Sequence, residues 1–366
     1  MMRSVFNFFG TLLFLLLTLA SARAERQPFT QAIKKQFALA ATGEFTLENQ
    51  YGDVTIDCWD QDRLKLEVTI RVEARNEQEA QRFFEQIEIA IQNDPESVRA
   101  RTIIDGGWNW FGDKADFSID YRVWMPQGAL LDLTNQYGDA KICELARDAE
   151  LTISYGDLNL AGVGQQLELD LSYGKATIGK VGSARLDVRY ATLGLAEARE
   201  VELESQYSKL RFTEAGSIRT KSRYDQFDIG QIRDFQFEGR YGNIKIDAAE
   251  RVDVYSKYTQ VEVARVADKA EFDMHYGGAQ LDRVEKGFSK VNLVGRYANY
   301  RVEIDDDASY QLRGEGEHCR LDVPRKLELA TDRREGNTRE LQGHSGVKNA
   351  RSMVTVKLNY GGVSMQ

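Results

Sequence analysis

One short phrase recurs through this chain, and its spacing limits what the chain can fold into. The phrase starts with Tyr, often continues with Gly and then Asp or Asn, and goes on with alternating apolar and polar residues, as in YGDLNL at Tyr155. From Tyr137 to Tyr276 the steps between successive copies are 18, 18, 17, 17, 17, 17, 17 and 18 residues. A fixed period of this size is the signature of a repeat protein. The phrase begins at Tyr51, Tyr137, Tyr155, Tyr173, Tyr190, Tyr207, Tyr224, Tyr241, Tyr258, Tyr276, Tyr297 and Tyr360.

The residues around each Tyr alternate in polarity. Apolar residues dominate four and six positions before it, as at Val201 and Leu203, and three and five positions after it, as at Ile244 and Ile246. A period of two predicts strands with one buried face. The phase breaks at Tyr-Gly, which predicts a corner, and we expect the Gly to supply the unusual backbone dihedrals there.

A unit of two short strands cannot bury its own apolar face, so it must stack on its neighbours. Equivalent strands then run parallel, with one coil above the next. The sequence therefore predicts an all-β fold, a single parallel β-solenoid of about 12–13 coils of 17–18 residues each. Crossovers between parallel strands favour a right-handed β-helix.

The sequence divides into three segments. Residues 1–24 have a basic start at Arg3, an apolar run and a small-x-small site, which predicts a signal peptide. An uncleaved N-terminal anchor is the alternative. Residues 25–136 hold the first coil and an insertion, which we interpret as a small α+β N-terminal cap with a helix that begins at Asn76. Residues 137–366 are the solenoid repeats, with a polar loop or hairpin at 325–351.

The coil before this polar segment departs from the pattern. His318 stands 21 residues after Tyr297, at the place where the phrase predicts Tyr. Leu321 and Val323 follow at the expected apolar positions. We interpret this stretch as a degraded coil.

The NQYGDVTI phrase that ends at Ile56, with its many echoes, resembles the bacterial "putative adhesin" domains of β-strand repeats that are common in envelope proteins of the Bacteroidota. The head domain of "putative autotransporter adhesins" is similar. The resemblance covers nearly all of the chain after residue 24. It implies a β-helix and a location in the cell envelope, and it brings no catalytic residues.

Charge and cysteine content narrow the classes of partner. The formal net charge is −9, which argues against a nucleic acid and gives no reason to expect binding to anionic lipid. The three Cys do not make a disulfide scaffold. Cys58 and Cys143 stand at similar places after Tyr51 and Tyr137, so a disulfide between adjacent coils is open to them and Cys319 would be free. His275, His318 and His344 lack metal-ligand spacing, and we expect no metal site or cofactor.

Three features are candidates for binding. Trp108, Trp110 and Phe111 stand in a Gly-flanked stretch of the insertion and would suit a glycan or protein partner, or would pack on the cap. The tyrosines would form a ladder of stacked rings at one corner, which is packing or an aromatic strip for a partner. Acidic residues recur three and five positions before many of the tyrosines, as at Glu202 and Glu204. They predict a salt-bridged face or, less directly, bound calcium, for which the run 305–307 is the weak candidate.

No nucleophile elbow, phosphate loop or metal-binding helix stands in the sequence. The function that we expect is a non-catalytic protein of the cell envelope or surface, an adhesin that binds a glycan or a protein. The exported chain would lie in the periplasm, on the outer surface or outside the cell. Two alternatives stay open: a periplasmic structural or sensing module that partners a membrane protein, and a polysaccharide-cleaving β-helix enzyme.

Overall fold

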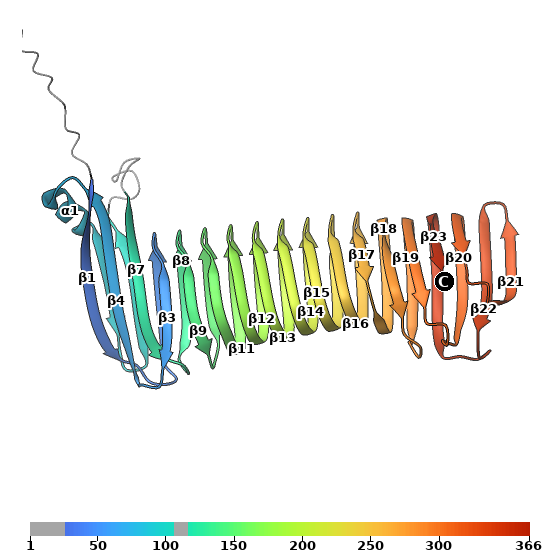
Figure 1. Ribbon diagram of the computed structural model, residues 1–366, viewed down its shortest axis with the longest axis horizontal. Helices are drawn as coiled ribbons and strands as arrows, with labels where there is room; N and C mark the ends of the chain where they lie inside the picture. Colours follow the sequence, from blue (N-terminus) through green and yellow to red (C-terminus); the bar gives the residue numbers. More distant parts are fainter. Residues whose placement is uncertain (1–25, 106–115) are drawn as a thin grey trace, which may run out of the picture.

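The computed structural model describes residues 26–105 and 116–366, and in them it shows the predicted parallel β-solenoid as one long rod (Figure 1). Each strand of the regular body is a long one that turns a corner and pairs in register with the strand of the next coil. The strands of this body are β11 (Leu158–Ser172), β12 (Lys175–Arg189), β13 (Thr192–Gln206), β14 (Lys209–Arg223), β15 (Gln226–Arg240) and β16 (Asn243–Lys257).

The buried columns are those that the alternation predicts. Within one coil Leu203, Leu210 and Phe212 point into the rod, and each is at most 3% exposed. Their equivalents in the next coil lie directly beside them, because the register of the parallel strands is kept from coil to coil. The rod is therefore filled by continuous columns of apolar side chains, and burial of these columns holds the coils together.

The Asp of the repeated phrase has a role at the corner. The side chain of Asp139 accepts a hydrogen bond of 2.8 Å from the backbone N–H of Asp157, and Asp157 accepts one of 2.9 Å from the N–H of Lys175. Each carboxylate thus satisfies a backbone donor in the next coil, which explains why a turn-forming acid stands at this place.

The insertion forms the predicted cap at the N-terminal end of the rod. Strand β1 (Gln27–Ala38) runs antiparallel to β4, β4 runs antiparallel to β7, and β5 pairs antiparallel with β6. The helix of the cap is capped by Asn76, whose side chain accepts a hydrogen bond from the N–H of Glu79. The bounds are β4 (Arg63–Ala74), α1 (Glu77–Phe84), β5 (Ile87–Asn93), β6 (Ser97–Ile104) and β7 (Phe117–Pro126).

The first coil lies inside the stack and not at its end. Strand β3 pairs with β7 on one side and β9 on the other, and β2 lies between β6 and β8. Strand β10 continues the stack from β8 into β11. The cap therefore covers the coil that precedes it in sequence. The bounds are β2 (Glu44–Gln50), β3 (Val54–Trp59), β8 (Leu130–Gln136), β9 (Ala140–Leu145) and β10 (Ala149–Ser154).

The C-terminal end departs from sequence order in the same way. The last strand, β23, lies between β19 and β20 and pairs in parallel with both. The polar segment is a hairpin of β21 and β22, and β22 pairs antiparallel with β20 (Figure 1). The bounds are β17 (Gln260–Val263), β18 (Val266–Val284), β19 (Lys290–Ile304), β20 (Tyr310–Asp322), β21 (Glu328–Glu335), β22 (Thr338–Ser345) and β23 (Ser352–Met365).

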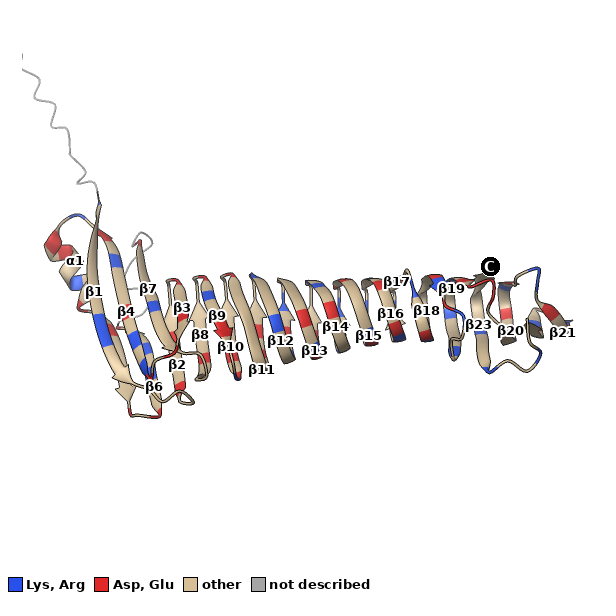
Figure 2. Ribbon diagram, turned by 60° about the horizontal axis from the view of Figure 1, so that its bottom comes forward, with Lys and Arg blue, Asp and Glu red and all other residues tan. Residues whose placement is uncertain are grey.

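Charged residues of both signs occur along the whole rod (Figure 2). Many form pairs between adjacent coils, such as Lys180 with Glu197 and Arg211 with Asp228. Within the described residues no helix is long and apolar enough to cross a membrane. The right-handed winding stays a prediction.

Candidate functional site

The repeated tyrosines stack into a ladder along one corner of the rod. Ring centroids of adjacent coils lie 4.7–5.1 Å apart and the rings are within 15° of parallel, from Tyr51 through Tyr297 to Tyr360 and then His318. Tyr137 and the ladder tyrosines after it are 40–49% exposed. His318 thus fills a tyrosine position, and its ring stacks on Tyr360 because β23 lies beside β20.

The corner dihedrals correct one expectation. The ladder residue itself, and not the Gly after it, adopts the left-handed backbone, with φ between 51° and 61° at each ladder position. Among the glycines that follow a ladder Tyr, Gly361 has a positive φ, of 138°. A left-handed non-glycine residue costs about 1–2 kcal/mol, and stacking contributes about 0.5–1.5 kcal/mol per aromatic pair. The ring that stacks on two neighbours therefore offsets the strain of the corner that it occupies.

Stacking also decides what the ladder presents to a partner. The two faces of an inner ring are covered by the rings of adjacent coils, so ring edges and phenol hydroxyls face solvent. A sugar ring packs on an aromatic face, and these faces are taken. The ladder therefore offers hydrogen bonds rather than a stacking platform.

Beside the ladder runs a groove of about 500 Å³ that crosses five coils, from β12 to β16. We call it the central groove. Its two walls are rows of equivalent residues held in register by the parallel strands. Small residues at Ser205, Ser222 and Gly239 lie between the rows. The outer row is Asp187, Glu204, Lys221, Glu238 and Tyr255, and the inner row, next to the ladder, is Arg189, Gln206, Arg223, Arg240 and Lys257.

Tyr255 differs from the ladder tyrosines. It stands three residues before Tyr258, where most coils have a charged side chain, and it is 51% exposed. Among the described residues no ring stacks on it, and its exposed side chain lines the groove. The sequence signal was present, since an aromatic residue stands at a solvent-facing position of the alternation, but the regular tyrosines masked it.

Below the groove the core contains a buried carboxylate. Asp225 is 1% exposed and accepts hydrogen bonds from the hydroxyls of Ser205 and Ser222 and from the backbone N–H of Ser208, at 2.6–2.7 Å. Burial raises the pKa of Asp225, and these hydrogen bonds oppose the rise. In other coils the same position holds Gly, Ala, Ser, Thr or Cys, so the charged Asp at this place was a signal that the sequence contained.

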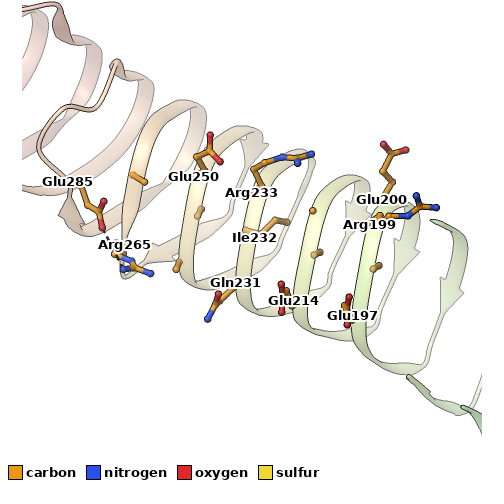
Figure 3. A pocket seen from close by; sticks show the side chains of 16 residues that line it. Glu197, Arg199, Glu200, Glu214, Gln231, Ile232, Arg233, Glu250, Arg265 and Glu285 are labelled. Atoms are coloured by element: carbon orange, nitrogen blue, oxygen red, sulfur yellow. Dashed lines mark ion pairs between the residues drawn. The ribbon is translucent and has the colours of Figure 1, made fainter. Parts of the chain in front are cut away.

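A second groove of about 780 Å³ lies at another corner of the rod (Figure 3). Small residues such as Ala198, Ala215 and Ala249 line it, and its rims carry Arg199, Arg233 and Arg265 among more numerous acids. Arg233 pairs with Asp234 and Arg265 with Glu285. The mixture of paired charges and the lack of an exposed aromatic make this groove the weaker candidate.

The remaining sequence candidates lie apart from the central groove. Cys58 and Cys143, on β3 and β9, are joined by a disulfide with their Cα atoms 5.8 Å apart, and Cys319 is free. Asp305 is hydrogen-bonded by the N–H of Asp307 and by Arg283, which hold its pKa below the usual range. No group of acids, His or Cys in the described part of the chain is arranged to hold a metal ion.

The aromatic residues Trp108, Trp110 and Phe111 lie outside the described residues. Their role in binding stays a prediction. His275 stands in the inner row beyond Lys257, in register with it, and His344 lies 3.5 Å from Glu328 on the C-terminal hairpin.

Comparison with known proteins found similar folds and no close relative. No family model and no curated protein matches the chain. Similar solved structures include a "putative cell adhesion protein" from Clostridium sporogenes, with 7% identity, 92% of this chain and 99% of that chain covered, and a TM-score of 0.18. A "putative adhesin" from Parabacteroides distasonis has 11% identity, coverage of 92% and 97% and a TM-score of 0.31.

A "putative lipid binding protein" from Parabacteroides distasonis is a third similar structure, with 8% identity, coverage of 92% and 96% and a TM-score of 0.23. Likeness at these TM-scores says nothing about the activity of this chain.

Proposed function

We propose that this chain is a non-catalytic protein of the cell envelope or surface that binds an extended glycan along the central groove. The observation that carries the proposal is the groove itself, which is open, crosses five coils and offers one side chain from the outer row and one from the inner row at each step. A linear polymer fits such a site because each coil offers one more equivalent set of contacts. A compact small molecule would use only a part of it.

The groove has the chemistry of a sugar site. Its walls supply guanidinium and ammonium groups, which donate hydrogen bonds to sugar hydroxyls, and carboxylates, which accept them. The amide of Gln206 can do both. Tyr255 adds an aromatic face on which a pyranose ring packs. The acids of the groove all stand in the outer row, without a pair of carboxylates set apart by burial, so the same surface gives little support to hydrolysis.

The first test is the substitution Tyr255→Ala. We expect it to weaken binding of a linear polysaccharide by about tenfold, because the ring contributes on the order of 1 kcal/mol to a stacked contact. Affinity electrophoresis through gels that contain single polysaccharides measures the effect. Tyr255→Phe is the matched control, since it keeps the ring and removes the hydroxyl.

Binding that survives Tyr255→Ala unchanged would remove this residue from the site. If no polysaccharide of a broad panel retards the wild-type protein, the proposed function is wrong. The location is tested separately by protease treatment of intact cells: cleavage on whole cells indicates the outer surface, and protection until the outer membrane is opened indicates the periplasm.

A further inference from the structure

The inner row of the central groove continues past the groove as a line of cations. Arg223, Arg240 and Lys257 lie side by side on three consecutive coils, in register across the parallel strands. The line goes on through His275 and Arg296 on the next two coils. Arg223, Arg240, Lys257 and Arg296 are exposed.

These cations have no acidic partners within the described part of the protein. None of Arg223, Arg240 and Lys257 forms an ion pair, although the net charge of the chain is −9. In neighbouring columns the pattern is different: Arg185 and Arg219 both reach Glu202. Arg189, at the start of the inner row, pairs with Asp187, so the absence of counter-charges is a property of the stretch from Arg223 to Lys257.

Like charges directly opposite each other on adjacent strands destabilise a sheet, so an unpaired row of cations carries an electrostatic cost. An anion that lies between two neighbouring cations removes this repulsion and gains two charge-assisted hydrogen bonds. The rings of the ladder repeat every 4.7–5.0 Å along this part of the rod. A sugar residue in an extended chain has about the same length as this step.

Two further rows lie beside the cations: the ladder tyrosines and, on the other side of the ladder, a row of amides. Phenol hydroxyls of Tyr224, Tyr241 and Tyr258 lie next to the cations in sequence, and the exposed amides of Gln226, Asn243 and Gln260 stand in register beyond them. On a glycan bound here, the cations would contact acidic groups, and the phenols and amides would contact hydroxyls. No exposed aliphatic side chain stands in the rows of cations, ladder tyrosines and amides, which disfavours a lipid surface.

We propose that the central groove binds a linear acidic polysaccharide, one that carries carboxylates or sulfates along its length, with its acidic groups on Arg223, Arg240 and Lys257. This inference rests on the proposed function and names the class of glycan. The chain of the glycan runs along the axis of the rod, because the cations are ordered in that direction.

The test uses two triple variants of the full mature chain. In the first, Arg223→Gln, Arg240→Gln and Lys257→Gln are combined. In the second, Arg199→Gln, Arg233→Gln and Arg265→Gln remove the same number of charges at the corner in Figure 3. The probes are polygalacturonate, its fully methyl-esterified form, alginate and hyaluronate, and the readout is calorimetry or affinity electrophoresis at low and high salt.

We expect the wild type and the second variant to bind at least one acidic polysaccharide. The first variant should bind it about 10- to 100-fold more weakly, since exposed ion pairs each contribute modestly. Added salt should weaken the binding of the wild type more than that of the first variant. Circular dichroism of both variants checks that the solenoid is intact.

Other outcomes separate the two proposals. Equal binding of polygalacturonate and its methyl ester would overturn the acidic class and leave glycan binding in place. Equal loss in both triple variants would show an effect of net charge and overturn the assigned row. Polyglutamate bound as tightly as the polysaccharides would show a general polyanion site and overturn the glycan, and no binding to any probe would count against both proposals.

Discussion

At the scale of single residues, the ladder tyrosines and Asp225 show how this rod accepts locally unfavourable states. Each ladder Tyr adopts a left-handed backbone that its stacked neighbours offset. Asp225 is a charged group in an apolar interior that three hydrogen bonds at 2.6–2.7 Å partly offset. The stacked rings and two of the three hydrogen bonds to Asp225, those from Ser205 and Ser208, come from an adjacent coil, so the repeat supplies most of the compensation.

The raised pKa of Asp225 predicts a pH dependence of stability. Because the folded pKa lies above the unfolded value of about 3.9, the folded state binds more protons between these two values, and stability falls as pH rises through that window. Asp225→Asn removes the buried charge, so we expect a higher urea midpoint than wild type at pH 7. The advantage should disappear below about pH 4, where wild-type Asp225 is protonated in both states.

Asp225→Ala is the control. It leaves the hydroxyls of Ser205 and Ser222 without their acceptor and should lower the urea midpoint at both pH values, since an unsatisfied buried donor costs about 1–3 kcal/mol. If Asp225→Asn were less stable than wild type at pH 7, the ionised form would be the one that the site favours.

At the scale of elements, the corners fall into two kinds that look alike in sequence. A Cβ added at Gly156 would lie 2.0 Å from the carbonyl oxygen of Gly138 in the preceding coil. At Gly242, also directly after a ladder Tyr, the nearest atom would be 3.5 Å away. Corners at Gly174, Gly277 and Gly361 are as tight, with a carbonyl oxygen 2.0–2.1 Å away, whereas Ala191 and Ala298 occupy this position in other coils. The tight corner is therefore a property of particular coils along the rod.

This difference predicts opposite results for one substitution. Gly156→Ala should destabilise the rod by about 1–3 kcal/mol, because the backbone of the neighbouring coil must move. Gly242→Ala should be neutral or should stabilise by up to about 1 kcal/mol, because it fits and restricts the unfolded chain. Urea unfolding of the two variants measures this, and equal effects would refute the distinction between the two kinds of corner.

Most of the fold was predictable from the sequence, because one period fixed both the strands and the stacking. The capping of α1 by Asn76 and the substitution of His318 for a ladder Tyr also followed from local pattern. The order of the coils at the ends was not predictable, since every coil carries compatible columns and spacing does not say which coil is next to which. The central groove depends on small residues such as Gly239 between two rows of longer side chains. Small residues in a repeat are not by themselves a sign of a binding site, so the groove was not predictable from the sequence.

At the scale of the whole molecule, the last strand of the chain lies inside the rod, and the hairpin of β21 and β22 lies at the C-terminal end. β23 pairs with β19 on one side and β20 on the other, and it buries Val354, Val356 and Leu358 between them. The coil of β20 therefore reaches the body of the rod only through β23. Since each coil is stabilised by its direct neighbours, the effect of losing β23 should be local.

Removal of residues 352–366 tests this arrangement. We expect faster amide hydrogen exchange and easier proteolysis in β20 and its hairpin, because β20 loses its parallel partner, while the coils from β11 to β16 keep their protection. A synthetic peptide of residues 352–365 should restore the protection of β20. Unchanged exchange in β20 after the truncation would contradict the role of β23.

The inserted strands at the two ends bear on how such a rod changes length in evolution. At the N-terminal end β3 lies between β7 and β9, and at the C-terminal end β23 lies between β19 and β20. A coil added next to β3 or β23 would find the strands on both sides already paired. A copy of an internal coil, by contrast, brings its own ladder ring and its own columns, so tandem duplication within the gene can lengthen the rod and extend its repeated surface by one step while both closed ends remain as they are.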